Sequence, residues 1–308
     1  MDHRPSPLSL LPPDLREATL TGVPLRELTT LRIGGPADLV CPARNPDDAK
    51  RFQAFAADRG LPFFVLGGGS NLLGADEGCG GVVLRVATTG FAVRGDTVRA
   101  GAGLDFDDLI ARTLGAGLTG LEFASGIPGT LGGALVGNAG CYGHEIGEFL
   151  VEALVLRPDG RLETVGPEAF GFAYRATALR ETRTIVLEAL LRLGRGDPAA
   201  AGAQRAGHIA DRRRKHPVDL PSAGSWFRNL PPAEPGGRRQ PAGVLLEQAG
   251  AKAMREGDAA VFAKHANIVV NLGRATSADV RRLVERMRAA VRERFGVELV
   301  EEVRQLGP

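Results

Sequence analysis

The chain has 308 residues, of which 44% are hydrophobic and 24% charged, and this composition is typical of a globular protein of about two domains. Its 38 basic and 36 acidic residues leave a net charge of +2, which disfavours nucleic acid or a membrane surface as partner. The N-terminal residues contain no apolar stretch long enough for a signal peptide or a membrane span, so we expect a cytoplasmic protein.

The first elements along the chain are short strands and one well-marked helix. Residues 29–40 predict a short strand broken by a glycine pair. Asn45 can cap a helix that ends at Gly60, since a proline and two aspartates follow the cap, as they do at the start of many helices. The apolar run 61–66 then predicts a buried strand, which leads directly into the glycine loop GGGSNLL at 67–73.

The glycine loop at 67–73 follows a strand, as a dinucleotide-binding fingerprint does. The spacing GxGxxG fails because Leu72 stands where the third glycine should be, and no helix follows. The GK[ST] signature of a P-loop is absent too. What remains is a loop of small residues with backbone N–H groups, plus Ser70 and Asn71 as donors. Such a loop can hold a diphosphate without a helix dipole.

Strands dominate the middle of the chain. Residues 91–103 and 151–165 predict two hairpins, the second turning at Pro-Asp-Gly. Asp105 opens a helix between the hairpins that ends at one of the next glycines, and 186–193 adds another strand. Many strands with only a few helices indicate an α+β fold.

The stretch 126–143, GIPGTLGGALVGNAGCYG, carries seven glycines among eighteen residues. Because each internal glycine costs a helix or strand about 0.5–1 kcal/mol relative to alanine, we expect neither element here. A flexible linker is the alternative, but linkers are rich in serine, proline and charge, whereas this stretch interleaves aliphatic residues. The stretch therefore predicts a backbone that bends sharply and lies close to something flat or phosphorylated.

Composition changes at 194–206, which is the best candidate for a domain boundary. The basic run at 211–217 is either the solvated end of a helix or a site for phosphates. Thr276 begins a capping box for a helix with one apolar stripe that ends at Gly296. Residues 297–307 predict a closing strand.

Common hydrolase and zinc motifs are absent, and neither the scattered histidines nor the three distant cysteines, Cys41, Cys79 and Cys141, predict a metal site or disulfides. Polar clusters remain at Tyr174–Arg175, at Ser225 beside the only tryptophan, and at Glu301–Glu302. Taken singly, each has an ordinary explanation as a salt bridge, a turn hydroxyl or an exposed strand residue.

Six motifs follow one another along the chain: GGGSNLL, GIPGTLGGALVGNAGCYG, YRAT, PSAGSWFRN, KHAN and EEVR. In this combination the sequence closely resembles the UDP-N-acetylenolpyruvoylglucosamine reductases of bacterial cell-wall synthesis, over roughly residues 22–307. It looks like their shorter type, which has no tyrosine-bearing substrate loop.

The resemblance implies an α+β fold with a two-lobed FAD-binding domain of the vanillyl-alcohol-oxidase type. This domain would span 1–197, with lobes at about 1–86 and 87–197, and an α+β substrate-binding domain would span 198–308. The last strand, 297–308, would return to the flavin site. FAD would be bound non-covalently, NADPH would be the reductant, and the protein would work as a monomer.

The resemblance also implies which residues line FAD, through glycines that let backbone N–H groups reach the diphosphate and the ring. They are Thr30, Gly67, Gly68, Gly69, Ser70, Asn71, Leu72, Gly126, Ile127, Pro128, Gly129, Thr130, Gly132, Gly133, Asn138 and Gly140. Residues implied for binding the nucleotide sugar or NADPH are Tyr174, Lys215, Asn229, Lys264 and His265.

Carried over motif by motif, Arg175 of YRAT would stabilise the carboxylate of UDP-N-acetylglucosamine enolpyruvate. Ser225 of GSWFRN would donate a proton, and Glu302 rather than Glu301 would be the catalytic carboxylate. A guanidinium matches a carboxylate in geometry and charge, and the intermediate is basic enough for a hydroxyl to protonate it. The product would be UDP-N-acetylmuramate.

Several positions depart from the family pattern, which leaves the finer substrate contacts open. They are Thr177 for serine, His216 for glutamine, Leu230 for proline, Ala253 for glycine, Asn267 for glycine and Val300 for glutamate. The alternatives are another flavoenzyme of the same fold, such as a sugar or lactone oxidase, and a non-catalytic nucleotide-sugar-binding protein.

Overall fold

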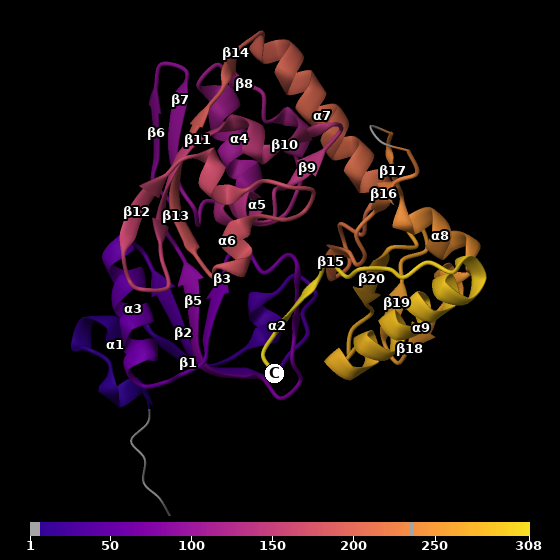
Figure 1. The fold of residues 1–308 in the computed structure, drawn as a ribbon, viewed down its shortest axis with the longest axis horizontal. Helices are drawn as coiled ribbons and strands as arrows, with labels where there is room; N and C mark the ends of the chain where they lie inside the picture. Colours follow the sequence, from indigo (N-terminus) through magenta and orange to yellow (C-terminus); the bar gives the residue numbers. More distant parts are fainter. Residues whose placement is uncertain (1–6, 235–236) are drawn as a thin grey trace, which may run out of the picture. The chain divides into compact units, whose positions relative to one another are not determined.

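The computed structural model describes residues 7–234 and 237–308 (Figure 1). These residues form two compact units, each built from several segments of the chain. The first unit comprises the described residues up to Val23, Ala37–Gly68 and Gly80–Asp211, and the second comprises Pro24–Pro36, Gly69–Cys79 and Arg212–Pro308. Among the described residues, no helix is both long and apolar enough to cross a bilayer.

The first unit contains a four-stranded sheet in the order β1-β2-β5-β3, in which β3 and β5 run parallel. Its elements are η1 Pro7–Leu10, α1 Pro13–Ala18, β1 Leu20–Pro24, β2 Pro36–Ala43, α3 Pro46–Asp58, β3 Phe63–Leu66 and β5 Cys79–Val86. The cap predicted for α3 is confirmed, since the Asn45 side chain accepts a hydrogen bond from the backbone N–H of Asp48 at 2.9 Å.

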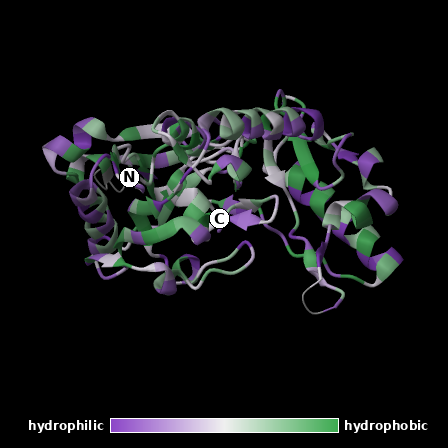
Figure 2. Ribbon diagram, turned by 90° about the horizontal axis from the view of Figure 1, so that it is seen from above, coloured by the Kyte–Doolittle hydropathy of each residue, from purple (hydrophilic) through white to green (hydrophobic). Residues whose placement is uncertain are grey.

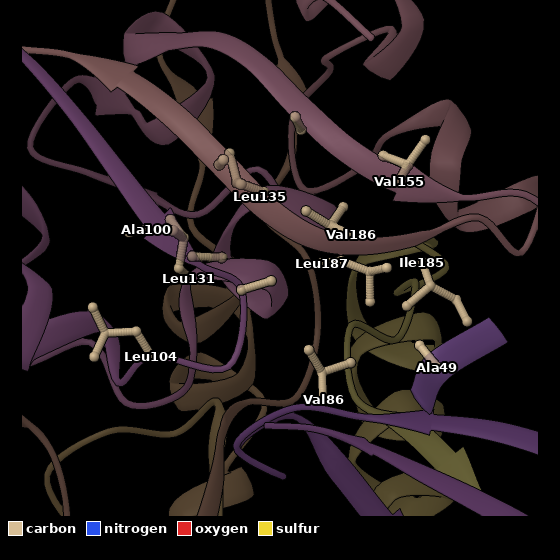
Figure 3. Packing of buried hydrophobic residues seen from close by; sticks show 14 of the residues in the cluster. Ala49, Val86, Ala100, Leu104, Leu131, Leu135, Val155, Ile185, Val186 and Leu187 are labelled. Atoms are coloured by element: carbon tan, nitrogen blue, oxygen red, sulfur yellow. The ribbon is translucent and has the colours of Figure 1, made fainter. Parts of the chain in front are cut away.

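A five-stranded antiparallel sheet, ordered β12-β11-β13-β7-β6, completes the first unit and contains both predicted hairpins. The remaining elements are β6 Phe91–Arg94, β7 Thr97–Gly101, α4 Phe106–Gly115, β8 Leu118–Thr119, η2 Glu122–Ala124, α5 Leu131–Val136, β9 Gly140–Cys141, β10 His144–Glu145, η3 Ile146–Phe149, β11 Leu150–Leu156, β12 Leu162–Val165, η4 Pro167–Phe170, α6 Ala178–Glu181, β13 Ile185–Arg192, β14 Gly194–Arg195 and α7 Pro198–Lys215. Figure 3 shows side chains of α5, β7, β11 and β13 gathered in the core of this unit.

The second unit is built around a four-stranded sheet, β15-β20-β19-β18, and the long helix α9. Its elements are α2 Leu25–Leu28, β4 Leu72–Gly74, β15 Ser222–Ser225, β16 Leu230–Pro232, β17 Arg239–Gln240, α8 Ala242–Gln248, η5 Ala251–Ala253, β18 Arg255–Glu256, β19 Ala259–Val261, β20 Ile268–Asn271, α9 Ser277–Phe295 and β21 Arg304–Leu306. The predicted apolar stripe of α9 is buried in the core of this unit. In Figure 2 the polar and apolar residues of the helices appear in purple and green.

Three local predictions were wrong. The strand expected at 29–40 begins only at Pro36, because Arg32 and Gly34 have φ angles of 56° and 121°, which an extended strand cannot contain. The closing strand is reduced to Arg304–Leu306, since its partner β4 offers only three residues. The glycine stretch includes a helix after all, the six-residue α5.

The composition change at 194–206 lies largely within α7, because its alanines favour a helix strongly enough to offset the glycines. The basic run at 211–217 is the end of this helix, as one of the two readings predicted. The compact units are divided at 211/212, and the second also includes the two early segments Pro24–Pro36 and Gly69–Cys79. The predicted domains were 1–197 and 198–308. The division into compact units does not say which unit binds which ligand, so the assignment of an FAD domain and a substrate domain stays a prediction.

Candidate functional site

Two glycine segments of the first unit meet backbone to backbone. A Cβ atom placed on Gly68 would lie 2.7 Å from the Cα of Gly129, and one on Gly67 would lie 2.6 Å from the Oγ1 of Thr130. Real Cβ atoms essentially never approach so closely, so only glycine allows this contact at Gly68 without moving backbone. The result is a surface of bare backbone, which suits a flat or phosphorylated group.

An acidic side chain that sequence analysis missed fixes the start of the glycine stretch. Asp107, in the first turn of α4, accepts a hydrogen bond from the backbone N–H of Gly126 at 2.8 Å and another from Arg205 of α7 at 2.5 Å. The Arg205 guanidinium thereby balances the charge of the carboxylate. No motif marks this pair, because its members are far apart in the sequence.

Packing within the first unit explains two glycines of α5 without any ligand. The N–H of Gly132 donates to the carbonyl of Ala102 at 2.8 Å, and a Cβ on Gly132 would lie 2.9 Å from the Cβ of Ala102. The N–H of Gly133 donates to Thr130 Oγ1 at 3.4 Å, so that Thr130 caps α5. Their predicted contact with FAD stays a prediction.

Asn138 is fully buried, and its side chain is committed to the protein. Its amide donates to Glu145 at 2.5 Å and to the carbonyl of Ala173 at 3.1 Å, while its Oδ1 accepts from the N–H of Gly147 at 3.3 Å. Asn138 also has a φ of 44°, a conformation that asparagine tolerates better than most residues. Its side chain therefore shapes the loop, whatever its backbone binds.

The backbone around Asn138 holds Arg175. The Arg175 guanidinium donates to the carbonyls of Asn138 at 3.3 Å and Gly140 at 2.8 Å, and it lies 5.6 Å from the centre of the Tyr174 ring. Arg175 itself has a φ of 54°, so the surrounding structure keeps a strained backbone in place. Backbone strain of this kind is common at active sites and at residues that bind ligands.

In the second unit, the early loops pack against the strand that carries Ser225. The Thr30 N–H donates to the carbonyl of Gly69 at 3.1 Å, and the Thr30 hydroxyl donates to the carbonyl of Ser222 at 2.7 Å. Gly69 has a φ of 65°, and a Cβ there would lie 2.0 Å from the carbonyl oxygen of Leu28. Two of the predicted cofactor residues, Thr30 and Gly69, thus contact each other.

The second unit also brings Ser225 and Glu302 close along the backbone. Ser225 ends β15, and the next residue, Trp226, accepts a hydrogen bond at its carbonyl from the N–H of Glu302 at 2.7 Å. The carbonyl of Glu302 in turn accepts from the side-chain amide of Asn71 at 3.1 Å. A predicted cofactor residue, the predicted proton donor and the predicted catalytic carboxylate therefore belong to one hydrogen-bonded region.

The predicted substrate contacts differ in their surroundings. Asn229 Oδ1 accepts from the N–H of Ala242 at 3.2 Å and so supports the start of α8. Burial lowers the pKa of His265, which favours its neutral form and makes it a hydrogen-bonding group rather than a charge partner for phosphate. Lys215 and Lys264 are exposed cations.

One departure from the motif pattern, Asn267, has a structural role. It is 2% exposed, its Oδ1 accepts from the N–H of Phe227 at 2.9 Å, and its Nδ2 donates to the carbonyl of Phe227 at 2.7 Å. The carbonyl of Asn267 accepts from the N–H of Trp226 at 2.7 Å. A glycine could not make the two side-chain bonds, so this asparagine helps to fix the segment after Ser225. Across residues 7–234 and 237–308, no three metal-ligating side chains gather.

Comparison with known proteins identifies the family. The family model "UDP-N-acetylenolpyruvoylglucosamine reductase, C-terminal domain" matches residues 216–306, and the model "FAD binding domain" matches residues 37–166. The reductase 2 of Symbiobacterium thermophilum is 44% identical over 92% of this chain and 91% of its own length, and that of Rubrobacter xylanophilus is 42% identical over 92% and 94%. The chain belongs to the UDP-N-acetylenolpyruvoylglucosamine reductase family.

The solved structure of the Thermus caldophilus reductase agrees with this membership. It has a TM-score of 0.78 and 34% identity, and the match covers 93% of this chain and 98% of that one. The predicted family, α+β fold and FAD cofactor are therefore confirmed. The bare backbone at Gly68 and Gly129 fits the diphosphate or ring of FAD, because glycine backbone can approach such a group closely.

Proposed function

We propose that this reductase converts UDP-N-acetylglucosamine enolpyruvate to UDP-N-acetylmuramate with NADPH as reductant, as the names of its relatives and the order of its motifs indicate. When bound, FAD would supply the redox chemistry that links NADPH to the terminal carbon of the enolpyruvyl group. The carbon–carbon double bond thereby gains one hydride and one proton, and NADPH becomes NADP⁺.

In this proposal Arg175 stabilises the negative charge that spreads into the substrate carboxylate. Its guanidinium is always protonated and presents paired donors that match the two carboxylate oxygens. The carbonyls of Asn138 and Gly140 hold the arginine in a fixed orientation, so little freedom has to be lost when the substrate binds.

Ser225 donates the proton to the carbon next to the carboxylate in this proposal. A hydroxyl is a weak acid, but a carbanion-like enolate is a strong enough base to take its proton. Glu302 binds or orients the same region of the substrate. The observation that carries the proposal is the hydrogen bond between the backbones of Glu302 and Trp226, at 2.7 Å, because it holds the segment of Glu302 next to the segment of Ser225.

The proposed partners are two small molecules, the nucleotide sugar and NADPH. Lys215 and Lys264 offer exposed positive charge for their phosphates, whereas neutral His265 would contribute a hydrogen bond. We also propose that the enzyme works as a monomer in the cytoplasm, where its substrate and NADPH would be available.

A spectrum of the purified protein tests the function. We expect a yellow flavin band that NADPH bleaches and that UDP-N-acetylglucosamine enolpyruvate restores under anaerobic conditions. A band restored only by oxygen would indicate an oxidase on the same fold, and a colourless protein would indicate a nucleotide-sugar-binding protein without redox activity.

The variant Ser225→Ala tests the proton donor. The variant should still be reduced by NADPH but should lose most of its product formation, because the acid is removed while the flavin region of the first unit is untouched. Undiminished turnover would refute the role of Ser225.

A further inference from the structure

Glu301, the neighbour of the proposed catalytic carboxylate, is anchored at both of its oxygens. The indole N–H of Trp226 donates to Oε2 at 3.1 Å, and the guanidinium of Arg288, on α9, donates to Oε1. A carboxylate is the side chain best suited to accept from two donors at once, and bonds to a charged acceptor are stronger than neutral ones.

The two segments that this carboxylate joins are otherwise held by little backbone pairing. Phe227 and Glu301 form an isolated antiparallel bridge, the N–H of Arg228 donates to the carbonyl of Val300 at 2.9 Å, and Glu302 donates to Trp226. No regular strand forms between 297 and 303, so the pairing register depends on these few bonds.

Arg288 adds support from the helix side. Its side chain is 23% exposed, it pairs with Glu285 at 3.1 Å, and its guanidinium carbon lies 6.0 Å from the centre of the Phe227 ring. The guanidinium therefore touches both segments, one through the Glu301 carboxylate and the other through the aromatic ring.

We propose that Glu301 is a positioning residue for the reduction of the substrate. Together with Trp226 and Arg288 it locks the segment of Ser225 to the segment of Glu302, so that the proton donor and the carboxylate keep a fixed separation. This inference rests on the proposed function. Glu301 itself does not touch the reacting atoms; it acts through Ser225 and Glu302, and its loss lets their relative position drift.

Rapid-mixing kinetics on the FAD-loaded enzyme separate this role from general instability. In Glu301→Ala, reduction of the flavin by NADPH should keep its wild-type rate, while reoxidation by UDP-N-acetylglucosamine enolpyruvate should slow by about 10- to 100-fold, since a displacement near 1 Å can reduce a rate by that much. Trp226→Phe should slow the same step. The double variant should be no slower than the slower single variant, because both remove one shared contact.

Matched variants complete the design. Glu301→Gln keeps an oxygen that can accept from the indole and should recover part of the rate. Glu285→Gln removes another ion-pair partner of Arg288, on α9 itself, and it should leave both steps unchanged. Because Trp226 is the only tryptophan, its fluorescence reports this contact directly, and its emission should change in Glu301→Ala and less so in Glu301→Gln.

The outcomes separate this inference from the proposed function. Wild-type enzyme that turns over, with Glu301→Ala reoxidised just as fast, would overturn the positioning role alone. If Glu301→Ala slowed both steps equally and lowered the melting temperature, and Glu301→Gln recovered nothing, the role of Glu301 would be general stability and not positioning. Wild-type enzyme that NADPH reduces but the substrate does not reoxidise would overturn the proposed function and this inference with it.

Discussion

Replacing Asn138 by alanine removes three side-chain hydrogen bonds from a fully buried position in the first unit, those to Glu145, Ala173 and Gly147. At about 1 kcal/mol of net stability for each bond, their loss lowers the free energy of unfolding by about 3 kcal/mol. The φ of 44° adds about 1 kcal/mol, since alanine is strained in the left-handed region. The expected total of about 4 kcal/mol is a large part of the stability of a typical domain.

Asn138→Gly is the matched variant. It loses the same three hydrogen bonds but not the conformational preference, because glycine adopts positive φ freely. We therefore expect Asn138→Gly to be about 1 kcal/mol more stable than Asn138→Ala, as measured by urea unfolding of the apoprotein.

Activity gives an independent readout at the same position. The carbonyl of Asn138 orients the Arg175 guanidinium, so a displaced loop should raise KM for the nucleotide sugar more than KM for NADPH. An alanine variant within 1 kcal/mol of wild type, or a glycine variant less stable than the alanine one, would refute the assigned contributions.

Three further results are expected. Gly68→Ala should purify with little flavin, because the new Cβ would meet the backbone of Gly129. A low ratio of absorbance at 450 nm to absorbance at 280 nm would show this loss, and full flavin content would contradict the bare-backbone site. Hydrogen bonds from Thr276 hold the pKa of the Asp279 carboxyl below its ordinary 3.8, so the stabilisation of α9 by this carboxylate is complete above pH 3.8 and is lost as the pH falls through the lowered pKa. Asp279→Asn should flatten the pH dependence of unfolding in this range. An unchanged profile would argue against the capping box as the source of that dependence. Burial raises the pKa of the Cys41 thiol to about 11, so a thiol reagent at pH 8 should modify half-buried Cys141 before Cys41 in the native enzyme. Equal labelling of Cys41 and Cys141 would contradict the burial of Cys41.

The sequence by itself determined the elements whose signals are local. Asn45 and Thr276 cap their helices through bonds to residues three positions later, and a pattern of three or four residues is enough to recognise such a cap. The hairpins at 91–103 and 151–165 likewise follow from the turn residues at their centres, which are Pro-Asp-Gly in the second. The order of the six motifs determined the family, because together they span nearly the whole chain.

Only the tertiary structure decided what individual side chains within those motifs do. Asn138 lies in a motif read as cofactor-binding, yet its side chain is used to shape the loop that holds Arg175, and Asn229 supports a helix start. The contact of Trp226 with Glu301 joins residues far apart in sequence, so no spacing rule could find it. Local hydrogen bonds join residues at fixed offsets and can be predicted from the sequence. Long-range contacts depend on which distant segments the complete fold places next to each other.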